Sequence, residues 1–386
     1  MISNTNSNSF VKYSFNMSAK KIGILTMHKV LNYGSALQAY ALQQYLSSAG
    51  NDAELIDYIF PNGKRKSPDN VRGAIINCIA NVLVHFPIKR KKRRFAAFYD
   101  SYFNCTREQF NSPEELMYFK LNYDILITGS DQVWNPKHIK DDLSFFLPFA
   151  DEKTPKYAYA SSFSTATIPE TLSETFRNNL MRYDRISVRE KSGLEIVKKL
   201  TGEEAVLVCD PTLLLTKEEW SAMADKADSK FRFPKGKYIL VYLLRYAYDP
   251  YPTVTDIINK VQKELKLPIV VLDPSLSESK FMNSTYVRDA GPLEFLKLIR
   301  DAAFVVTSSF HGTAFSLNFE VPFFSIVKER GRFDTRMIDL LDRAGTDRDI
   351  VYNASVDKPL DMDYTTVSRN IAEFRNKSKA FINSIL

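Results

Sequence analysis

One histidine stands in a short polar segment between two apolar runs. Residues 304–328 read FVVTSSFHGTAFSLNFEVPFFSIVK, and His311 within them is one of only four histidines among 386 residues. An unperturbed imidazole titrates near neutral pH, so it suits acid–base catalysis. Its small neighbours would cradle a phosphate through hydroxyl and N–H groups: Ser308, Ser309, Gly312 and Thr313. A plain helix N-cap is the alternative interpretation of the same residues.

The sequence around this turn predicts its place in the fold. Phe304–Thr307 is typical of a buried strand, Ala314–Phe319 of a helix, and Val321–Val327 of a second strand. Strand, turn, helix and strand in this order form the repeating unit of a parallel α/β sheet. Ligands of such sheets bind beyond the carboxyl ends of the strands, which is where His311 is expected.

Other polar residues also follow predicted strands. Arg189 ends the run DRISVR, where a guanidinium can bind a carboxylate or phosphate, although an ion pair with Glu190 or Asp184 is the alternative. The loop after Ile22–Met27 and the segment GSDQVWN carry residues that suit sugar hydroxyls, or plain turns. These residues are Asn32, Gly34, Ser130, Asp131 and Asn135.

Two Rossmann-like halves are visible along the chain. Residues 20–230 are predicted as the first domain, and their opening loop lacks GxGxxG, so a dinucleotide fingerprint is absent. The polar segment Ser221–Lys237 is predicted as the linker to a second domain at 231–350. Residues 351–386 hold an amphipathic helix that must cover an apolar surface, and we expect it to cross back onto the first domain. Residues 1–19, rich in Ser and Asn, are predicted as a disordered lead-in.

Residues 61–121 are predicted as an insertion in the first domain. Val71–Phe86 is typical of an apolar helix, and the basic run KRKKRR follows at 89–94. A core-packing helix with a solvated basic end is the favoured interpretation. Peripheral contact of residues 71–94 with an anionic membrane surface is the alternative.

The composition limits the classes of function. A net charge of +7 over 386 residues favours anionic ligands but is too small for a dedicated nucleic-acid binder. The three cysteines are scattered, and their spacing predicts neither a disulfide framework nor a metal site. A reducing cytoplasm suits such a chain, and no apolar run is long enough for a transmembrane helix.

Five motifs in this order resemble the polysaccharide pyruvyl transferase family. They are NYGSALQAYAL, ITGSDQVWN, SVRE, CDPT and TSSFHGTAFSLNFEVPF, and they extend from Lys21 to about Leu341. The resemblance implies a GT-B-like fold, with two Rossmann-like domains facing across a cleft. It implies transfer of the enolpyruvyl group of phosphoenolpyruvate onto two sugar hydroxyls as a cyclic ketal, in cell-surface or exopolysaccharide synthesis. No cofactor or metal is implied.

The resemblance assigns roles that remain expectations at this point. His311 is the expected acid and base, and Arg189 the clamp for the donor's carboxylate or phosphate. Lys328 and Arg330 are expected to assist the phosphate cradle, and the polar residues of the first domain to bind the acceptor, a sugar or lipid-linked oligosaccharide. Localisation is expected to be cytoplasmic, or peripheral at the inner face of the membrane.

Two rival functions stay open. A nucleotide-sugar-dependent glycosyltransferase would share the fold and would also bind phosphate through basic residues. A non-catalytic protein that binds anionic glycans or a membrane surface would need the basic run but not His311.

Overall fold

The computed structural model describes residues 19–60, 71–139, 142–245, 248–274, 281–329, 335–354 and 357–386, with backbone only for 71–85 and 138–139. The predicted lead-in, apart from its last residue, and Arg330 lie outside these ranges.

The first sheet has seven strands in the order β3-β2-β1-β4-β5-β6-β7, and all its pairs are parallel. Its strands are β1 Lys21–Leu25, β2 Asp52–Tyr58, β3 Cys105–Phe110, β4 Ile125–Thr128, β5 Lys156–Ser161, β6 Arg185–Val188 and β7 Val206–Leu207. Most of β1, β4 and β5 is buried, because helices cover both faces of such a sheet.

The second sheet has six strands in the order β10-β9-β8-β11-β12-β13, again all parallel. Its strands are β8 Ile239–Tyr242, β9 Ile269–Leu272, β10 Ser284–Val287, β11 Phe304–Thr307, β12 Phe323–Val327 and β13 Asp349–Val351. The polar strand β10 and the short β13 were not predicted from sequence, since neither has a run of apolar residues.

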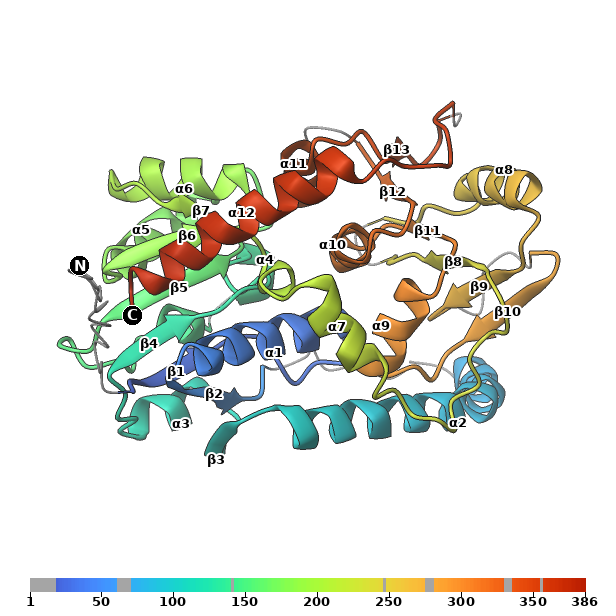
Figure 1. Ribbon diagram of the computed structural model, residues 1–386. Coiled ribbons are helices and arrows are strands. Elements are labelled where there is room, and N and C mark those ends of the chain that lie inside the picture. The colour runs from blue at the N-terminus through green and yellow to red at the C-terminus, as the bar shows by residue number, and fades with distance from the viewer. Residues whose placement is uncertain are drawn as a thin grey trace, which may run out of the picture.

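The α-helices cover these sheets (Figure 1). They are α1 Tyr33–Ser48, α2 Val71–Tyr102, α3 Pro113–Tyr118, α4 Pro136–Ile139, α5 Glu170–Leu180, α6 Lys191–Thr201, α7 Lys217–Ala224, α8 Val254–Leu265, α9 Pro292–Arg300, α10 Phe310–Phe319, α11 Thr335–Ala344 and α12 Thr365–Asn383; the short 3-10 helices are η1 Ser144–Phe146 and η2 Pro211–Leu213. The predicted α/β fold with two Rossmann-like halves is confirmed.

The predicted insertion at 61–121 is corrected by the topology. Strand β3 lies within it and pairs in parallel with β2, at the edge of the first sheet. Parallel neighbours need a crossover, and α2 belongs to that crossover. The helix is longer than predicted, because it continues through Pro87 and the basic run to Tyr102.

The basic run on α2 contacts the second domain. Arg90 and Arg94 both pair with Asp289, with nitrogen–oxygen distances of 2.7 and 3.1 Å. Lys91 lies 2.5 Å from Asp273 and its ammonium is 4.5 Å from the ring centre of Tyr33. The sequence had indicated a solvated basic end. Half of the run instead joins the two domains.

The last helix also contacts both domains (Figure 1). Near its start, Ser368 donates to Glu320 of the second domain at 2.6 Å. Further along, Ser378 accepts from the backbone of Cys209, and Phe381 packs beside Tyr159. The helix thus reaches the first domain, as predicted, after first lying on the second.

Helix α7, which the prediction placed in the first domain, contacts both domains. Trp220 in α7 contacts the ring of Phe315 in α10 at 5.1 Å, and its indole donates to the carbonyl of Thr212. Part of the predicted linker at 221–237 is therefore helical. Within the residues that the structure describes, no helix has the length and apolarity that crossing a bilayer requires.

Candidate active site at the domain junction

Helix α10 carries His311 in its first turn. The helix begins at Phe310, earlier than the predicted Ala314, because the side chain of Ser309 accepts a hydrogen bond from the N–H of Gly312 and acts as the N-cap. The preceding strand β11 is fully buried and ends at Thr307. His311 therefore lies at the carboxyl edge of the second sheet, where the sequence predicted it.

The hydroxyls predicted to cradle a phosphate are already bonded within the protein. Ser308 Oγ accepts from the N–H of Leu244 at 2.8 Å and donates to its carbonyl at 3.1 Å. Thr313 Oγ1 lies 2.6 Å from Ser325 Oγ, and both residues are fully buried. Ser308 thus ties the turn before α10 to the residue Leu244 after β8, and Thr313 ties α10 to β12.

A glycine of the first domain lies directly against the imidazole. A Cβ atom on Gly34, in the first turn of α1, would lie 1.9 Å from His311 Nδ1 and 2.2 Å from its Cγ. No larger residue fits while the histidine keeps this position. Beside them, Tyr33 stacks on Phe295 of α9 with ring centres 4.6 Å apart. Gly34 thus lets the two domains approach at the histidine.

Arg189 lies in the same place and is bound by two carboxylates. Its Nη1 is 2.6 Å from Asp210 Oδ2, and its Nη2 is 3.4 Å from Asp131 Oδ1. All three side chains are buried. The structure thus brings Arg189 and His311 together, as the sequence predicted, but with the guanidinium already engaged.

Asp210 connects the arginine to the histidine. Its Oδ1 accepts from the N–H and hydroxyl of Thr212 at 3.0 and 2.8 Å, which fixes the carboxylate at the start of η2. Its Oδ2 accepts from Ser130 at 3.1 Å and lies 3.7 Å from His311 Nε2, beyond hydrogen-bond distance. A short movement of the imidazole would form a hydrogen bond to Asp210.

Both carboxyl groups are held ionised by their neighbours. Burial alone would raise the pKa of Asp210, but His311 and Arg189 outweigh it, so the pKa lies well below its usual value. The same balance lowers the pKa of Asp131, where burial opposes Arg189, His311 and a hydrogen bond from Ser35. The same two carboxylates raise the pKa of Arg189 against the effect of its burial.

Of the predicted acceptor residues, Gly34, Ser130 and Asp131 line this junction. Asp131 adopts φ = 75°, a conformation that is costly for a non-glycine residue and is often retained at functional sites. The other two have local roles. Asn32 caps α1 by accepting from Ser35, and Asn135 bonds Gln132 and the backbone of residue 137.

Several polar atoms at the junction have no hydrogen-bond partner among the described residues. They are His311 Nε2, Arg189 Nε and Glu190 Oε2. The last two lie 4.0 Å apart, so the ion pair with Glu190 that the sequence offered as an alternative is present at long range. Buried polar atoms are rarely left unpaired, and those that are often have a functional role. Phe310 packs beside His311 with ring centres 5.2 Å apart, and the guanidinium of Arg189 lies 4.8 Å from the Phe310 ring centre. Lys328 directly follows β12 and is half-buried.

The family model for polysaccharide pyruvyl transferases matches residues 32–327, most of the chain and all of the junction described above. The chain belongs to the polysaccharide pyruvyl transferase family. No curated protein matches the sequence.

Two solved structures similar to this family member are named as UDP-N-acetylglucosamine 2-epimerases. One is a putative UDP-N-acetylglucosamine 2-epimerase from Listeria monocytogenes, with 8% identity, 94% of this chain and 90% of that chain covered, and a TM-score of 0.53. Another is the UDP-GlcNAc 2-epimerase of Methanocaldococcus jannaschii in complex with UDP-GlcNAc and UDP, with 12% identity, 94% and 98% coverage, and a TM-score of 0.52. Identities this low establish the fold alone, and they confirm the expected GT-B-like arrangement.

Two residues of the junction were not singled out from the sequence. Asp210 appeared only within the motif CDPT, and Ser35, which bonds Asp131, only within NYGSALQAYAL. Asp210 follows the apolar residues VLVC and precedes a proline, so a carboxylate at the end of an apolar run was the available signal. Ser35 gave no such signal, since its bond to Asp131 joins segments far apart in sequence.

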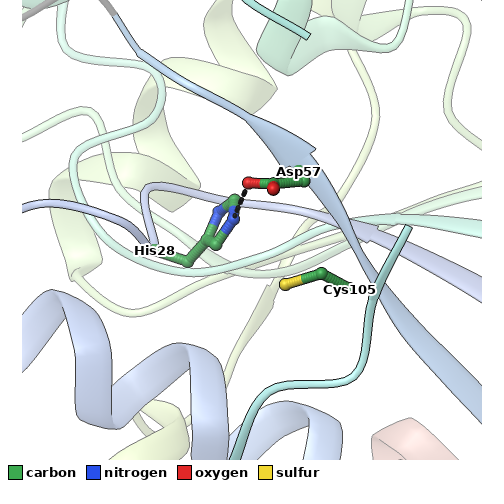
Figure 2. A group of neighbouring side chains, drawn as sticks. All are labelled: His28, Asp57 and Cys105. Carbon is green, nitrogen blue, oxygen red and sulfur yellow. Dashed lines mark hydrogen bonds and ion pairs between the residues drawn. The ribbon is translucent and has the colours of Figure 1, made fainter. Parts of the chain in front are cut away.

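A second polar cluster lies at β2 and β3 (Figure 2). His28 Nδ1 is 2.9 Å from the carbonyl of Thr26, and Nε2 is 3.3 Å from Asp57 Oδ1. The ligand atoms of His28, Asp57 and Cys105 lie within 4.8 Å of one another, as in a metal site. The ammonium of Lys29, however, already lies 2.5 Å from Asp57, and burial raises the pKa of Cys105 to about 12. The cluster is best described as a buried ion pair that anchors the β1–α1 loop.

This ion pair predicts a specific loss of stability in acid. Although burial opposes it, hydrogen bonds from His28 and Lys29 lower the pKa of Asp57 to about 2. The pKa of an aspartate in an unfolded chain is about 3.9. The contribution of Asp57 to the free energy of unfolding is therefore complete above that pH and is lost as the pH falls toward 2. The thermal midpoint of the wild type should therefore drop more steeply between these values than that of Asp57→Asn.

The control for this prediction is Asp52→Asn, an exposed position on the same strand. Its thermal midpoint should follow the pH dependence of the wild type. Parallel curves for Asp57→Asn and the wild type would show that the ion pair does not contribute in this way.

Proposed function

We propose that this protein transfers the enolpyruvyl group of phosphoenolpyruvate onto two hydroxyls of a sugar, forming a cyclic pyruvate ketal during synthesis of a cell-surface or exported polysaccharide. The observation that carries the proposal is the meeting of His311 with Arg189, Asp131 and Asp210 where the two domains join. Family membership supports the reaction class, and the junction supports the position of the site.

The proposed reaction needs proton transfers but no change in oxidation state. A proton adds to C3 of the donor while a sugar oxygen bonds to C2 and loses its proton. The C2–O bond to phosphate then breaks, and the second sugar hydroxyl attacks C2, closing the ring. Of the two hydroxyl protons, one balances the proton gained by C3 and the other leaves with phosphate or solvent. No redox cofactor is required, and neither is a metal.

The residues of the junction suit these steps. We assign His311 the proton transfers, because an imidazole both donates and accepts protons near neutral pH. Asp210 is proposed to orient the imidazole through Nε2, and Asp131 to receive a sugar hydroxyl. Arg189 is proposed to stabilise the donor through its Nε, since its other nitrogens bind the two carboxylates. Lys328, at the end of β12, is proposed to add positive charge near the donor.

The acceptor is proposed to bind from the side of the first domain, where Gly34, Ser130 and Asp131 lie. A lipid-linked sugar at the inner face of the membrane is one such acceptor. The exposed basic residues left on α2 would then contact the anionic surface: Lys89, Lys92 and Arg93. A location in the cytoplasm is part of this proposal.

The proposal is tested by following phosphate release from phosphoenolpyruvate with a panel of galactosides and N-acetylmannosaminides. Release that depends on one acceptor, together with a ketal in the product, is the expected result. Turnover of a nucleotide sugar without any release from phosphoenolpyruvate would favour the rival glycosyltransferase instead. Binding of a glycan or of anionic vesicles with turnover of neither donor would indicate a non-catalytic protein.

A further inference from the structure

The charges at the junction do not balance for an anionic donor. Arg189 carries one positive charge, and the lowered pKa values of Asp131 and Asp210 leave two negative charges beside it. Both Nη atoms of Arg189 are engaged by these carboxylates. A donor with a phosphate and a carboxylate would be repelled from such a site unless another cation lies near.

Arg336 is a cation in the right place. It lies in the first turn of α11, and its guanidinium is 5.8 Å from the ring centre of Phe310, the residue next to His311. Its charge also contributes to the low pKa of Asp131, below the effects of burial, Arg189, His311 and Ser35. Arg336 therefore lies close enough to act on the same group of charges.

The pairing of Arg336 differs from that of Arg189. Arg189 is 5% exposed and bound to carboxylates, whereas Arg336 is half-buried and makes no ion pair with any acidic residue in the described part of the chain. His311, which is 8% exposed and whose Nε2 makes no hydrogen bond within the described residues, lies at the same junction. A guanidinium without a carboxylate keeps its N–H groups for a ligand, and guanidinium geometry fits phosphate and carboxylate oxygens.

We propose that Arg336 binds an anionic group of the donor, its phosphate or carboxylate, near the Phe310 ring that the guanidinium of Arg189 also contacts. Arg189 then mainly holds Asp131 and Asp210 in place, while Arg336 supplies the charge that attracts the donor. This inference rests on the proposed site and assigns within it a residue that the sequence did not single out.

The test compares Arg336→Gln with Arg343→Gln on the same helix. Arg343 is exposed and lies over the ring of Phe374, away from His311. The affinities for phosphoenolpyruvate and for inorganic phosphate are measured by calorimetry, with the thermal midpoint as a check of folding. Losing one charge-assisted contact should weaken donor binding by about 10- to 100-fold. Arg336→Lys should recover part of that loss, and Arg343→Gln should bind as the wild type does.

The outcomes separate this inference from the proposed function. Wild-type affinity for both ligands in a folded Arg336→Gln variant would overturn the inference while phosphoenolpyruvate turnover by the wild type would still support the function. If the wild type does not bind phosphoenolpyruvate, the proposed function fails. In that case the affinity for inorganic phosphate alone tests the inference. Weaker phosphate binding by Arg336→Gln than by the wild type supports an anion site at Arg336, and unchanged binding overturns it.

Discussion

Replacing His311 by alanine should lower kcat by about 10²- to 10⁴-fold, the usual contribution of a positioned acid or base. An imidazole can both donate and accept a proton, whereas the two carboxylates beside it are held ionised and suit neither role as well. The fold should remain, because Asp210 keeps its bonds to Arg189, Ser130 and Thr212 without the histidine. Steady-state turnover and a thermal midpoint measure the two effects.

His311→Asn is the matched variant for this prediction, since the amide retains a polar group of similar position but does not transfer protons. It should be as inactive as the alanine variant and should still bind phosphoenolpyruvate. Near-normal kcat in His311→Asn would rule out proton transfer by this residue, and would move the search for the acid or base to another group.

Replacing Gly34 by alanine should destabilise the protein although alanine is the better helix former. In a helix interior, alanine would be favoured over glycine by about 1 kcal/mol. The new methyl group, however, would lie 1.9 Å from His311 Nδ1, so the imidazole or the domain junction must move. Overpacking of this kind usually costs about 1–3 kcal/mol, so we expect a lower thermal midpoint and a loss of turnover.

A double-mutant cycle isolates the cause. Gly34→Ala combined with His311→Ala removes the ring that the methyl group meets, so the double variant should be at least as stable as His311→Ala alone. Additive losses in the double variant would show that the alanine acts within α1 and not through the histidine.

The fold was predictable because its strands are compact and apolar. The bounds of β11 agree with the prediction, since the short buried run Phe304–Thr307 ends at a clear polar turn. The role of 61–121 was not predictable in this way. Its strand β3 reads CTREQF and lies at the sheet edge, with its middle residues exposed, so it lacks the apolar pattern of a buried strand.

The sequence located His311 and Arg189 but not the groups that bind them. Each residue follows a strand of a parallel sheet, where ligands usually bind, but the two strands belong to different sheets. The charge pairs at the junction depend on how the two domains pack together. The spacing of residues along the sequence does not predict that packing. The arginine expected to bind the donor is consequently held by Asp210 and Asp131, while Arg336 appeared in the sequence only as one charge on a helix.

The chain fastens its two domains along both long sides. Helix α12 runs from one to the other along one side, and α2 lies along the opposite side with Arg94 and Lys91 bound to the second domain (Figure 1). Hinge rotation of two domains requires one side of their junction to open. Here a helix crosses the junction on each side, α12 on one and α2 on the other. We therefore expect substrates to come and go by rearrangement of the strand-end loops, with little rotation of the domains as a whole.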